Sequence, residues 1–199
     1  MSPEDRIKCV KTTRGDQDFH RPHLYGRGWG GGKALLPGES VLSSRIETKV
    51  RQARFSDVPF IVNANVCLAL ETEGKRLGLD RVTAGVKALL GDEGKGTYFI
   101  AEVDGEVAGQ LLITREWSDW RNGHFWWIQS VYVVEQLRGA GVFRALFHHV
   151  RTLAKVQPDV CGIRLYMEAH NARARQAYER LGLKQTGYQV FEMEFQSAE

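Results

Sequence analysis

The sequence contains few cysteines and no long apolar run, and both absences narrow the class of protein. Its three cysteines among 199 residues, Cys9, Cys67 and Cys161, are far apart and form no Cys-x-x-Cys pair. This spacing excludes a dense disulfide framework, indicates a reducing compartment and argues against a zinc site, so we expect no bound metal. No apolar run approaches the roughly 20 residues of a membrane span, and the first residues lack the apolar segment of a secretory signal. We therefore expect a cytoplasmic protein with no membrane partner.

Positive charge exceeds negative charge only near the start of the chain. The first 45 residues hold eight Lys and Arg against five Asp and Glu, whereas the remainder carries 19 of each. A nucleic-acid surface needs an excess of positive charge. The balanced remainder therefore argues against a nucleic-acid partner.

Residues 1–45 are expected to form a flexible, glycine-rich leader, because they show neither the helical nor the strand period. Gly26, Gly28 and Gly31 fit G-x-G-x-x-G, and Gly32-Lys33 resembles part of a P-loop. A nucleotide site needs a strand before such glycines and a helix after them, and neither is indicated here. His20 and His23 are joined by no further His/Cys cluster. We therefore assign function to a domain over residues 46–199.

The most informative stretch is residues 125–147, FWWIQSVYVVEQLRGAGVFRALF. It begins with a dense apolar, β-branched run typical of a buried strand, and it ends with the apolar spacing of an amphipathic helix. Between them lies a glycine elbow, residues 135–141, containing Arg138-Gly139-Ala140-Gly141. The free N–H groups of a helix start attract anions, so the pattern indicates a phosphate or pyrophosphate cradle. A tight turn without a ligand is the alternative interpretation.

The remaining periodicities predict a mixed α/β (α+β) domain with a largely antiparallel sheet and about four helices. The Asp104-Gly105 pair predicts a hairpin, Asp80 and Asn171 are expected to cap helices, and Gly182 to end one. The expected strands are 47–55, 97–103, 106–117, 125–134, 163–168 and one or two within 183–195; the expected helices are 57–71, 81–90, 142–157 and 172–181.

This order and two motifs resemble the GNAT superfamily of acetyl-CoA-dependent N-acyltransferases over residues 46–195. The elbow fits the superfamily's R/Q-x-x-G-x-G/A pattern in two registers. Gln136, Gly139 and Gly141 match the letters but displace the helical core position. We prefer Arg138 and Gly141, a register that keeps Leu146 at a core position and puts Phe143 where Gly or Ala is usual. The run from Asn171 to Leu183 resembles N-x-x-A-x-x-x-Y-x-x-x-G-F. The string from Glu116 to Gly123 is similar to a bacterial subgroup of unassigned substrate.

The resemblance implies acetyl-CoA as the co-substrate and direct transfer of its acetyl group to a primary amine. In the superfamily the fourth and fifth strands diverge, and the pantetheine arm pairs with main chain in the gap. Asn171 would contact the pantetheine arm as well as capping its helix. The residues implied for the cofactor are Val131, Tyr132 and Val133 in the strand, Arg138, Gly139, Ala140, Gly141, Val142, Phe143 and Arg144 around the pyrophosphate, and Asn171.

The resemblance makes Tyr178 the general acid that protonates the departing thiolate. From spacing alone, Tyr178 fits a core aromatic on an apolar stripe equally well. The general base is open: some relatives carry Glu where this chain has Gln129, and Glu168 is one substitute, with a water relay as the alternative.

For the amine acceptor we consider the aromatic loop with Trp117, Trp120 and Arg121, because Trp faces hold cations or rings. Gln129 and Glu71 complete the acceptor candidates, although a charged surface face explains Glu71 as well. The acceptor is expected to be a small-molecule or peptide amine, and a homodimer is possible. The competing function is a non-catalytic acyl-CoA-binding module.

Overall fold

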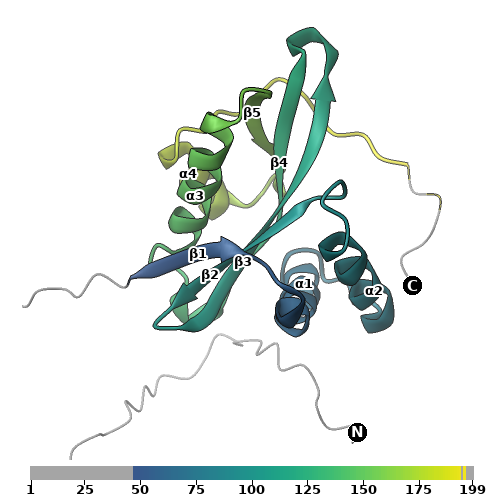
Figure 1. Cartoon of the computed structure of the whole chain (residues 1–199), viewed down its shortest axis with the longest axis vertical. Helices are drawn as coiled ribbons and strands as arrows, with labels where there is room; N and C mark the ends of the chain where they lie inside the picture. Colours follow the sequence, from purple (N-terminus) through teal and green to yellow (C-terminus); the bar gives the residue numbers. More distant parts are fainter. Residues whose placement is uncertain (1–46, 194, 196–199) are drawn as a thin grey trace, which may run out of the picture. The chain divides into compact units, whose positions relative to one another are not determined.

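The computed structural model describes residues 47–193 and 195, and these residues are organised around one five-stranded sheet (Figure 1). The strands follow the order β1-β2-β3-β4-β5 across the sheet. Neighbours from β1 to β4 are antiparallel, and β5 runs parallel to β4. The prediction of a mixed, largely antiparallel sheet is confirmed. The strands are β1 (Thr48–Gln52), β2 (Thr97–Val103), β3 (Glu106–Ser118), β4 (Gly123–Val133) and β5 (Val160–Leu165).

Four α-helices cover the two faces of this sheet, as expected. They are α1 (Val58–Glu73), α2 (Leu79–Leu90), α3 (Val142–Val156) and α4 (Ala172–Arg180). In Figure 1, α1 and α2 lie on one side of the sheet and α3 and α4 on the other. Alternate residues of each strand point to opposite faces, so the sheet supports two apolar clusters. The cluster under α3 contains Leu111, Trp126 and Leu146, and the one under α1 and α2 contains Ile61 and Ile100.

The β2–β3 connection confirms the predicted hairpin. Asp104 has φ +53° and Gly105 has φ +85°. Two consecutive positive φ angles define the tight turn whose twist matches that of antiparallel strands, and Asp-Gly is well suited to it.

Three predicted features are wrong. Helix α2 begins at Leu79 with Gly78 as its N-cap, so Asp80 lies inside the first turn instead of capping it. Strand β5 starts at Val160, three residues early, because it pairs with β4 from His124 onward. The closing strands expected within 183–195 do not form in the described residues of that segment. Its apolar side chains, such as Phe191, are exposed and gain no partner strand. The interpretations placed on residues 1–46 lie outside the described residues.

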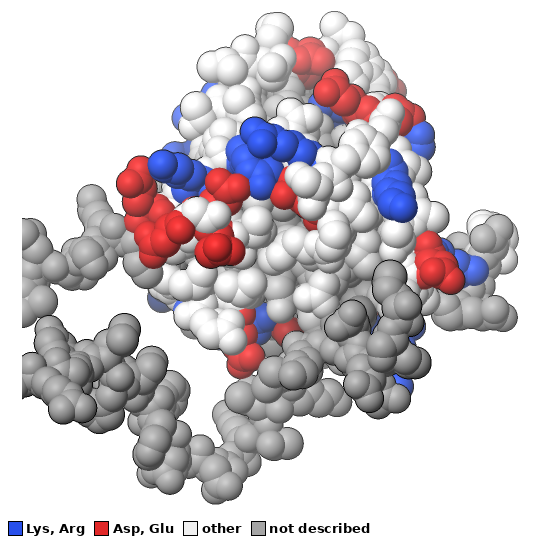
Figure 2. Space-filling model, turned by 60° about the horizontal axis from the view of Figure 1, so that its bottom comes forward, with Lys and Arg blue, Asp and Glu red and all other residues white. Residues whose placement is uncertain are grey.

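The described surface mixes both signs of charge. On the face in Figure 2, Lys and Arg side chains lie among Asp and Glu side chains. Exposed ion pairs such as Lys75–Glu73 illustrate the same mixing. Among the described helices, none combines the length and the apolar character needed to cross a membrane.

A buried carboxylate joins the first strand to the first helix. Asp57 is 6% exposed, and its carboxylate accepts both Nη1 and Nη2 of Arg51 at 2.7 and 2.9 Å. It also accepts the Arg54 N–H, and Arg51 Nε donates to Glu102 on β2. The hydrogen bonds from Arg51 are the main cause that holds the pKa of Asp57 below its usual value.

We predict that Asp57→Asn destabilises the fold by about 2 kcal/mol at pH 7, because it removes the charge of the buried partner that binds both Nη atoms of Arg51 and leaves only Glu102 paired with the guanidinium. The lowered pKa means that the carboxylate contributes its full stability above the unfolded pKa of about 4 and loses it as the pH falls through the lower folded pKa. Urea unfolding from pH 7 down to pH 3 should therefore show a wild-type advantage that narrows below about pH 4. Asp92→Asn, which breaks only an exposed pair with Lys95, is the control and should leave stability nearly unchanged. An equal effect of both substitutions would contradict the role of Asp57.

Candidate active site

Strand β4 continues past its partner β5, and this opens one edge of β4. The two strands pair from His124 to Ile128, whereas β4 extends to Val133. A β-bulge lies in the unpaired part: Leu112 faces Gln129 and Gln110 faces Tyr132, so two β4 residues oppose one on β3. Within the described residues, β5 does not pair with residues 129–133. Although Ser130 O and Val133 O accept side-chain hydrogen bonds, this edge can offer its other main-chain groups to an extended ligand.

The glycine elbow links the end of β4 to α3 with two glycines in the left-handed region. Gly139 has φ +87°, and Gly141, the N-cap of α3, has φ +97°. A side chain at either position would strain the turn, which accounts for both glycines. Because Gly141 has no side chain, no side-chain cap covers the first N–H groups of α3. The predicted strand–elbow–helix arrangement is confirmed, and Leu146 is fully buried, as the chosen motif register requires.

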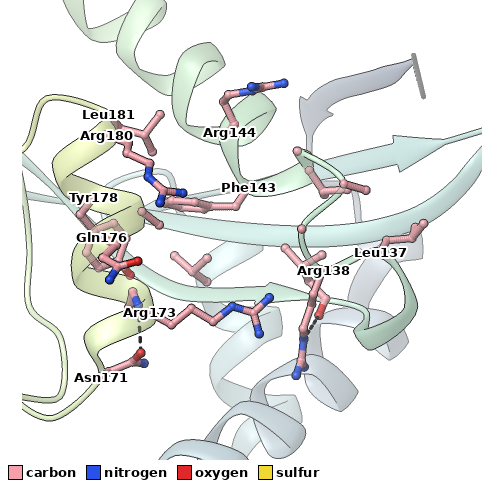
Figure 3. Close-up of a pocket in the computed structure, with 18 residues that line it drawn as sticks. Leu137, Arg138, Phe143, Arg144, Asn171, Arg173, Gln176, Tyr178, Arg180 and Leu181 are labelled. Carbon is pink, nitrogen blue, oxygen red and sulfur yellow. Dashed lines mark hydrogen bonds between the residues drawn. The ribbon is translucent and has the colours of Figure 1, made fainter. Parts of the chain in front are cut away.

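One cavity of about 770 Å³ lies between β4, the elbow and α4 (Figure 3). A volume in the range of ligand pockets, with both apolar walls and polar groups, is suited to an organic ligand. Val131 and Val133 line the cavity, but Tyr132 points elsewhere, toward the Arg138 guanidinium 5.5 Å from its ring. The other lining residues are Leu137, Arg138, Gly139, Ala140, Gly141, Val142, Phe143, Arg144, Asn171, Arg173, Ala174, Gln176, Ala177, Tyr178, Arg180 and Leu181.

The lining of the cavity is positively charged. It contains four arginines, Arg138, Arg144, Arg173 and Arg180, and no Asp or Glu. Arg173 and Arg180 project from α4 into the space between that helix and the elbow (Figure 3). Guanidinium groups combined with free helix N–H groups suit a phosphorylated ligand. The cavity therefore fits the predicted co-substrate, a pyrophosphate-bearing thioester.

Arg138 lines the cavity and also contacts two other groups of the protein. Its Nε donates to Val133 O at 2.9 Å, and its Nη2 donates to the Glu71 carboxylate at 2.8 Å. The guanidinium thus ties the end of β4 to the elbow and to α1. Glu71, considered as an acceptor residue, lies in this ion pair.

Tyr178 lies on the cavity wall beside Phe143. The two rings are edge to face with centroids 5.6 Å apart. Burial raises the pKa of Tyr178 above its ordinary value of about 10. The hydroxyl therefore stays protonated at neutral pH, as a proton donor must. Phe143 lines the cavity and packs on Tyr178 and Phe147. The residue at which this chain departs from the family motif therefore helps to hold the Tyr178 ring in place.

Asn171 and Glu168 both take part in the start of α4. Asn171 Oδ1 accepts the Ala174 N–H at 2.9 Å, which confirms the predicted cap, and Asn171 also lines the cavity. Glu168 is exposed, and its carboxylate accepts the His170 N–H at 2.8 Å. It does not line the cavity.

The opposite face of the β4–β5 split carries Gln129 and Tyr166. The Tyr166 hydroxyl donates to Gln129 Oε1 at 3.4 Å, just beyond the last paired residues of the two strands. Gln129 Nε2 also donates to Thr114. Trp127 packs against Tyr166 with centroids 5.7 Å apart. This aromatic and amide surface lies next to the split.

The aromatic loop lies at the far end of the β3–β4 hairpin. Trp117 pairs with His124, seven residues before Val131 on β4, which at about 3.3 Å per residue is a separation of about 20 Å. Trp120 is 84% exposed, and Arg121 lies 5.1 Å over the Phe125 ring. The structure thus does not bring these three residues together with Tyr178.

Sequence reasoning missed Arg173, Gln176 and Arg180 on α4. They share the stretch that begins with Asn171 and includes Tyr178, and all five line the cavity. Positions 173 and 180 are seven apart, so a helix brings both arginines to one face. That spacing was the available signal. Ser130, at the bulge of β4, was also missed and had no local signal.

A positively charged cavity at a strand split, bounded by a glycine elbow, is suited to a phosphorylated organic ligand. Residues 65–183 match the family model described as "Acetyltransferase (GNAT) family", and the chain belongs to that family. It is therefore an acetyltransferase with acetyl-CoA as co-substrate and an amine as acceptor. Nothing in the comparisons favours the non-catalytic binding module.

Individual relatives agree with this assignment. The chain is 26% identical over 148 residues to an N-alpha-acetyltransferase of Sulfurisphaera tokodaii, covering 70% of this chain and 81% of the relative. It is 43% identical to the crystal structure of a possible acetyltransferase from Clostridium difficile 630, with a TM-score of 0.70 and coverage of 75% and 99%. A predicted acetyltransferase with acetyl-CoA from Clostridium acetobutylicum is 18% identical, with a TM-score of 0.61 and coverage of 74% and 96%, and shares the fold.

Proposed function

We propose that the enzyme acetylates the α-amino group of a peptide or amino acid by direct attack on acetyl-CoA in a ternary complex. The observation that carries the proposal is one cavity lined by the β4 edge, the elbow and Tyr178. The thioester fits beside Val131, the pyrophosphate beside the elbow, and the thiolate within reach of a protonated tyrosine.

The mechanism forms a bond from the amine nitrogen to the carbonyl carbon and breaks the bond from that carbon to sulfur. The main-chain N–H of Val131 stabilises the negative charge that develops on the carbonyl oxygen. Tyr178 gives its proton to the departing thiolate, and water accepts the proton that the amine loses. No covalent enzyme intermediate is needed.

The choice of an α-amine follows from the state of the nearby carboxylates. Glu71 is paired with Arg138, and Glu168 accepts the His170 N–H. Gln129 is neutral at the split. An α-amine with pKa near 7.8 is about one-third neutral at pH 7.5, whereas a lysine amine is about 0.1% neutral. An α-amine therefore attacks without a dedicated carboxylate base, and the Sulfurisphaera tokodaii relative is named for α-amine acetylation.

The proposal predicts that a peptide with a free N-terminus and acetylated lysines reacts at least 100-fold faster than the same peptide with a blocked N-terminus and free lysines. Thiol release from acetyl-CoA measures the rate, and mass spectrometry locates the acetyl group. The value of kcat/KM should rise with pH and level off near the pKa of the acceptor amine.

Faster reaction of the lysine peptide or of a polyamine would contradict the proposal. A panel in which small amines and amino acids react but peptides do not would confine the acceptor to small molecules. The aromatic loop is tested in the same assay: Trp120→Ala should raise the KM for long peptides only, if the loop contacts residues distant from the N-terminus.

A further inference from the structure

Ser130 has a main-chain conformation that serine rarely adopts inside a strand. Its φ is +47°, in the left-handed region that favours glycine. Among the described non-glycine residues, only Asp104 and Asn122 share a positive φ, and both occupy turns, where Asp and Asn adopt this conformation readily. Ser130 instead lies at the bulge of β4, next to Val131. Surrounding structure must therefore hold it in place.

Hydrogen bonds link four residues from four elements at this bulge, and we call the four residues the Ser130 ring: Asn65 on α1, Tyr98 on β2, Gln110 on β3 and Ser130 on β4. Gln110 Nε2 donates to Asn65 Oδ1 at 2.8 Å and to Ser130 O at 3.2 Å. Asn65 Nδ2 donates to Tyr98 Oη at 3.0 Å. The ring thus holds Ser130 at its main-chain carbonyl.

Asn65 and Ser130 are partly buried, whereas Gln110 and Tyr98 lie in an otherwise apolar layer, which stability alone does not explain. Gln110 is fully buried and Tyr98 is 3% exposed, within the cluster that contains Val62, Ile100 and Leu112. Gln110 Oε1 accepts no hydrogen bond from the described residues. Leaving a buried acceptor unpaired is costly, and an apolar set of the same shape would avoid that cost. The ring therefore has a use other than packing.

We propose that the Ser130 ring is a positioning device that holds the β4 bulge so that the main chain of Val131 faces the thioester of acetyl-CoA. A slip of one residue in a strand turns each later side chain to the opposite face. Relaxing Ser130 to an extended conformation would remove the bulge, and Val131 would then turn away from the cavity that it lines. The inference rests on the proposed function, because it assigns the ring to that same reaction.

Tyr98→Phe tests the ring with little change in packing, because only a hydroxyl is removed. We expect kcat to fall about tenfold while the Kd for acetyl-CoA stays within twofold, since the elbow and the arginines are untouched. Tyr188→Phe, which removes the hydroxyl of a side chain that is 78% exposed, is the matched control and should leave both quantities unchanged. A Tyr98→Phe enzyme with wild-type kcat would overturn the proposal.

Ser130→Gly provides a second variant with a different expectation. Glycine adopts a positive φ without strain, so the bulge needs the ring less in this background. Ser130→Gly alone should keep kcat within threefold of wild type, and adding Tyr98→Phe to it should cost less than threefold more. A tenfold loss from Tyr98→Phe in both backgrounds would show that the hydroxyl acts by another route and would overturn the positioning role.

A readout without substrate separates this inference from the proposed function. The amide resonance of Val131 in the ligand-free protein should shift in Tyr98→Phe and return toward its wild-type position when Ser130→Gly is added. If wild-type enzyme released no thiol with any amine, the proposed function would fail whatever the resonance did. If wild type were active and the resonance stayed fixed in Tyr98→Phe, the inference alone would fail.

Discussion

Replacing Tyr178 by phenylalanine should lower kcat about 100-fold and leave the Kd for acetyl-CoA within twofold of wild type. The substitution removes only the hydroxyl, so the ring keeps its edge-to-face contact with Phe143. Without this proton donor the thiolate must take its proton from water, and a positioned general acid contributes at least that factor to the rate. Binding is retained because the elbow and the arginines are unchanged.

Two measurements on the same samples decide the role of Tyr178. Single-turnover thiol release gives the rate of the chemical step, and calorimetry with coenzyme A gives the affinity. Tyr188→Phe is again the control for loss of an exposed hydroxyl. Equal losses of rate and affinity would make Tyr178 a binding residue, and an unchanged rate would make it a core aromatic, the alternative that its spacing allowed.

The pH dependence of wild-type kcat adds an independent check. Because burial raises the pKa of Tyr178, the hydroxyl remains protonated well above neutral pH. Its deprotonation should therefore cause no fall in kcat between pH 7 and 9. The rise in kcat/KM that deprotonation of an α-amine should cause over the same range would then not be offset by loss of the Tyr178 proton.

Local sequence patterns predicted those parts of the molecule whose geometry depends on a few adjacent residues. The Asp104-Gly105 turn, the glycines of the elbow and the Asn171 cap each satisfy a main-chain requirement that neighbours in the sequence impose. The order of strands and helices followed because buried strands and amphipathic helices have distinct periods.

Features that depend on residues far apart in the chain could not be predicted from local sequence patterns. The carbonyl of Ser130 accepts a hydrogen bond from Gln110 on β3, which is itself bonded to Asn65 on α1, and the sequence around position 130 is an ordinary strand pattern. The pairing of the Arg138 guanidinium with Glu71, 67 residues earlier, also had no signal in the local sequence. The segment 183–195 has apolar residues suited to a strand, but a strand also needs an edge to pair with, and none pairs with its described residues.

The second large effect is expected from the two arginines of α4, which the sequence motif does not specify. They supply two of the four arginines that line the cavity. Arg173 and Arg180 are exposed, and no carboxylate lies among the residues that line the cavity with them. An exposed guanidinium that meets a phosphate contributes about 1 kcal/mol, which is a factor of about five in affinity. The double substitution Arg173→Ala/Arg180→Ala should therefore raise the Kd for acetyl-CoA about 30-fold and leave kcat at saturating acetyl-CoA nearly unchanged.

Charge, and not helix stability, should account for that loss. Arg175→Ala is the matched control, since Arg175 is on the same helix, donates to Ala169 O and does not line the cavity. Raising the salt concentration from 0.05 to 0.5 M should weaken acetyl-CoA binding to wild type several-fold and to the double variant much less, because screening acts on the same interactions. Dephospho-coenzyme A, which lacks the 3′-phosphate, tests which phosphate the arginines contact. If they contact the 3′-phosphate, the double substitution should weaken binding of dephospho-coenzyme A less than binding of acetyl-CoA. Should Arg175→Ala weaken binding as strongly as the double variant, the arginines would act on α4 as a whole, and the cavity would need another source of phosphate affinity.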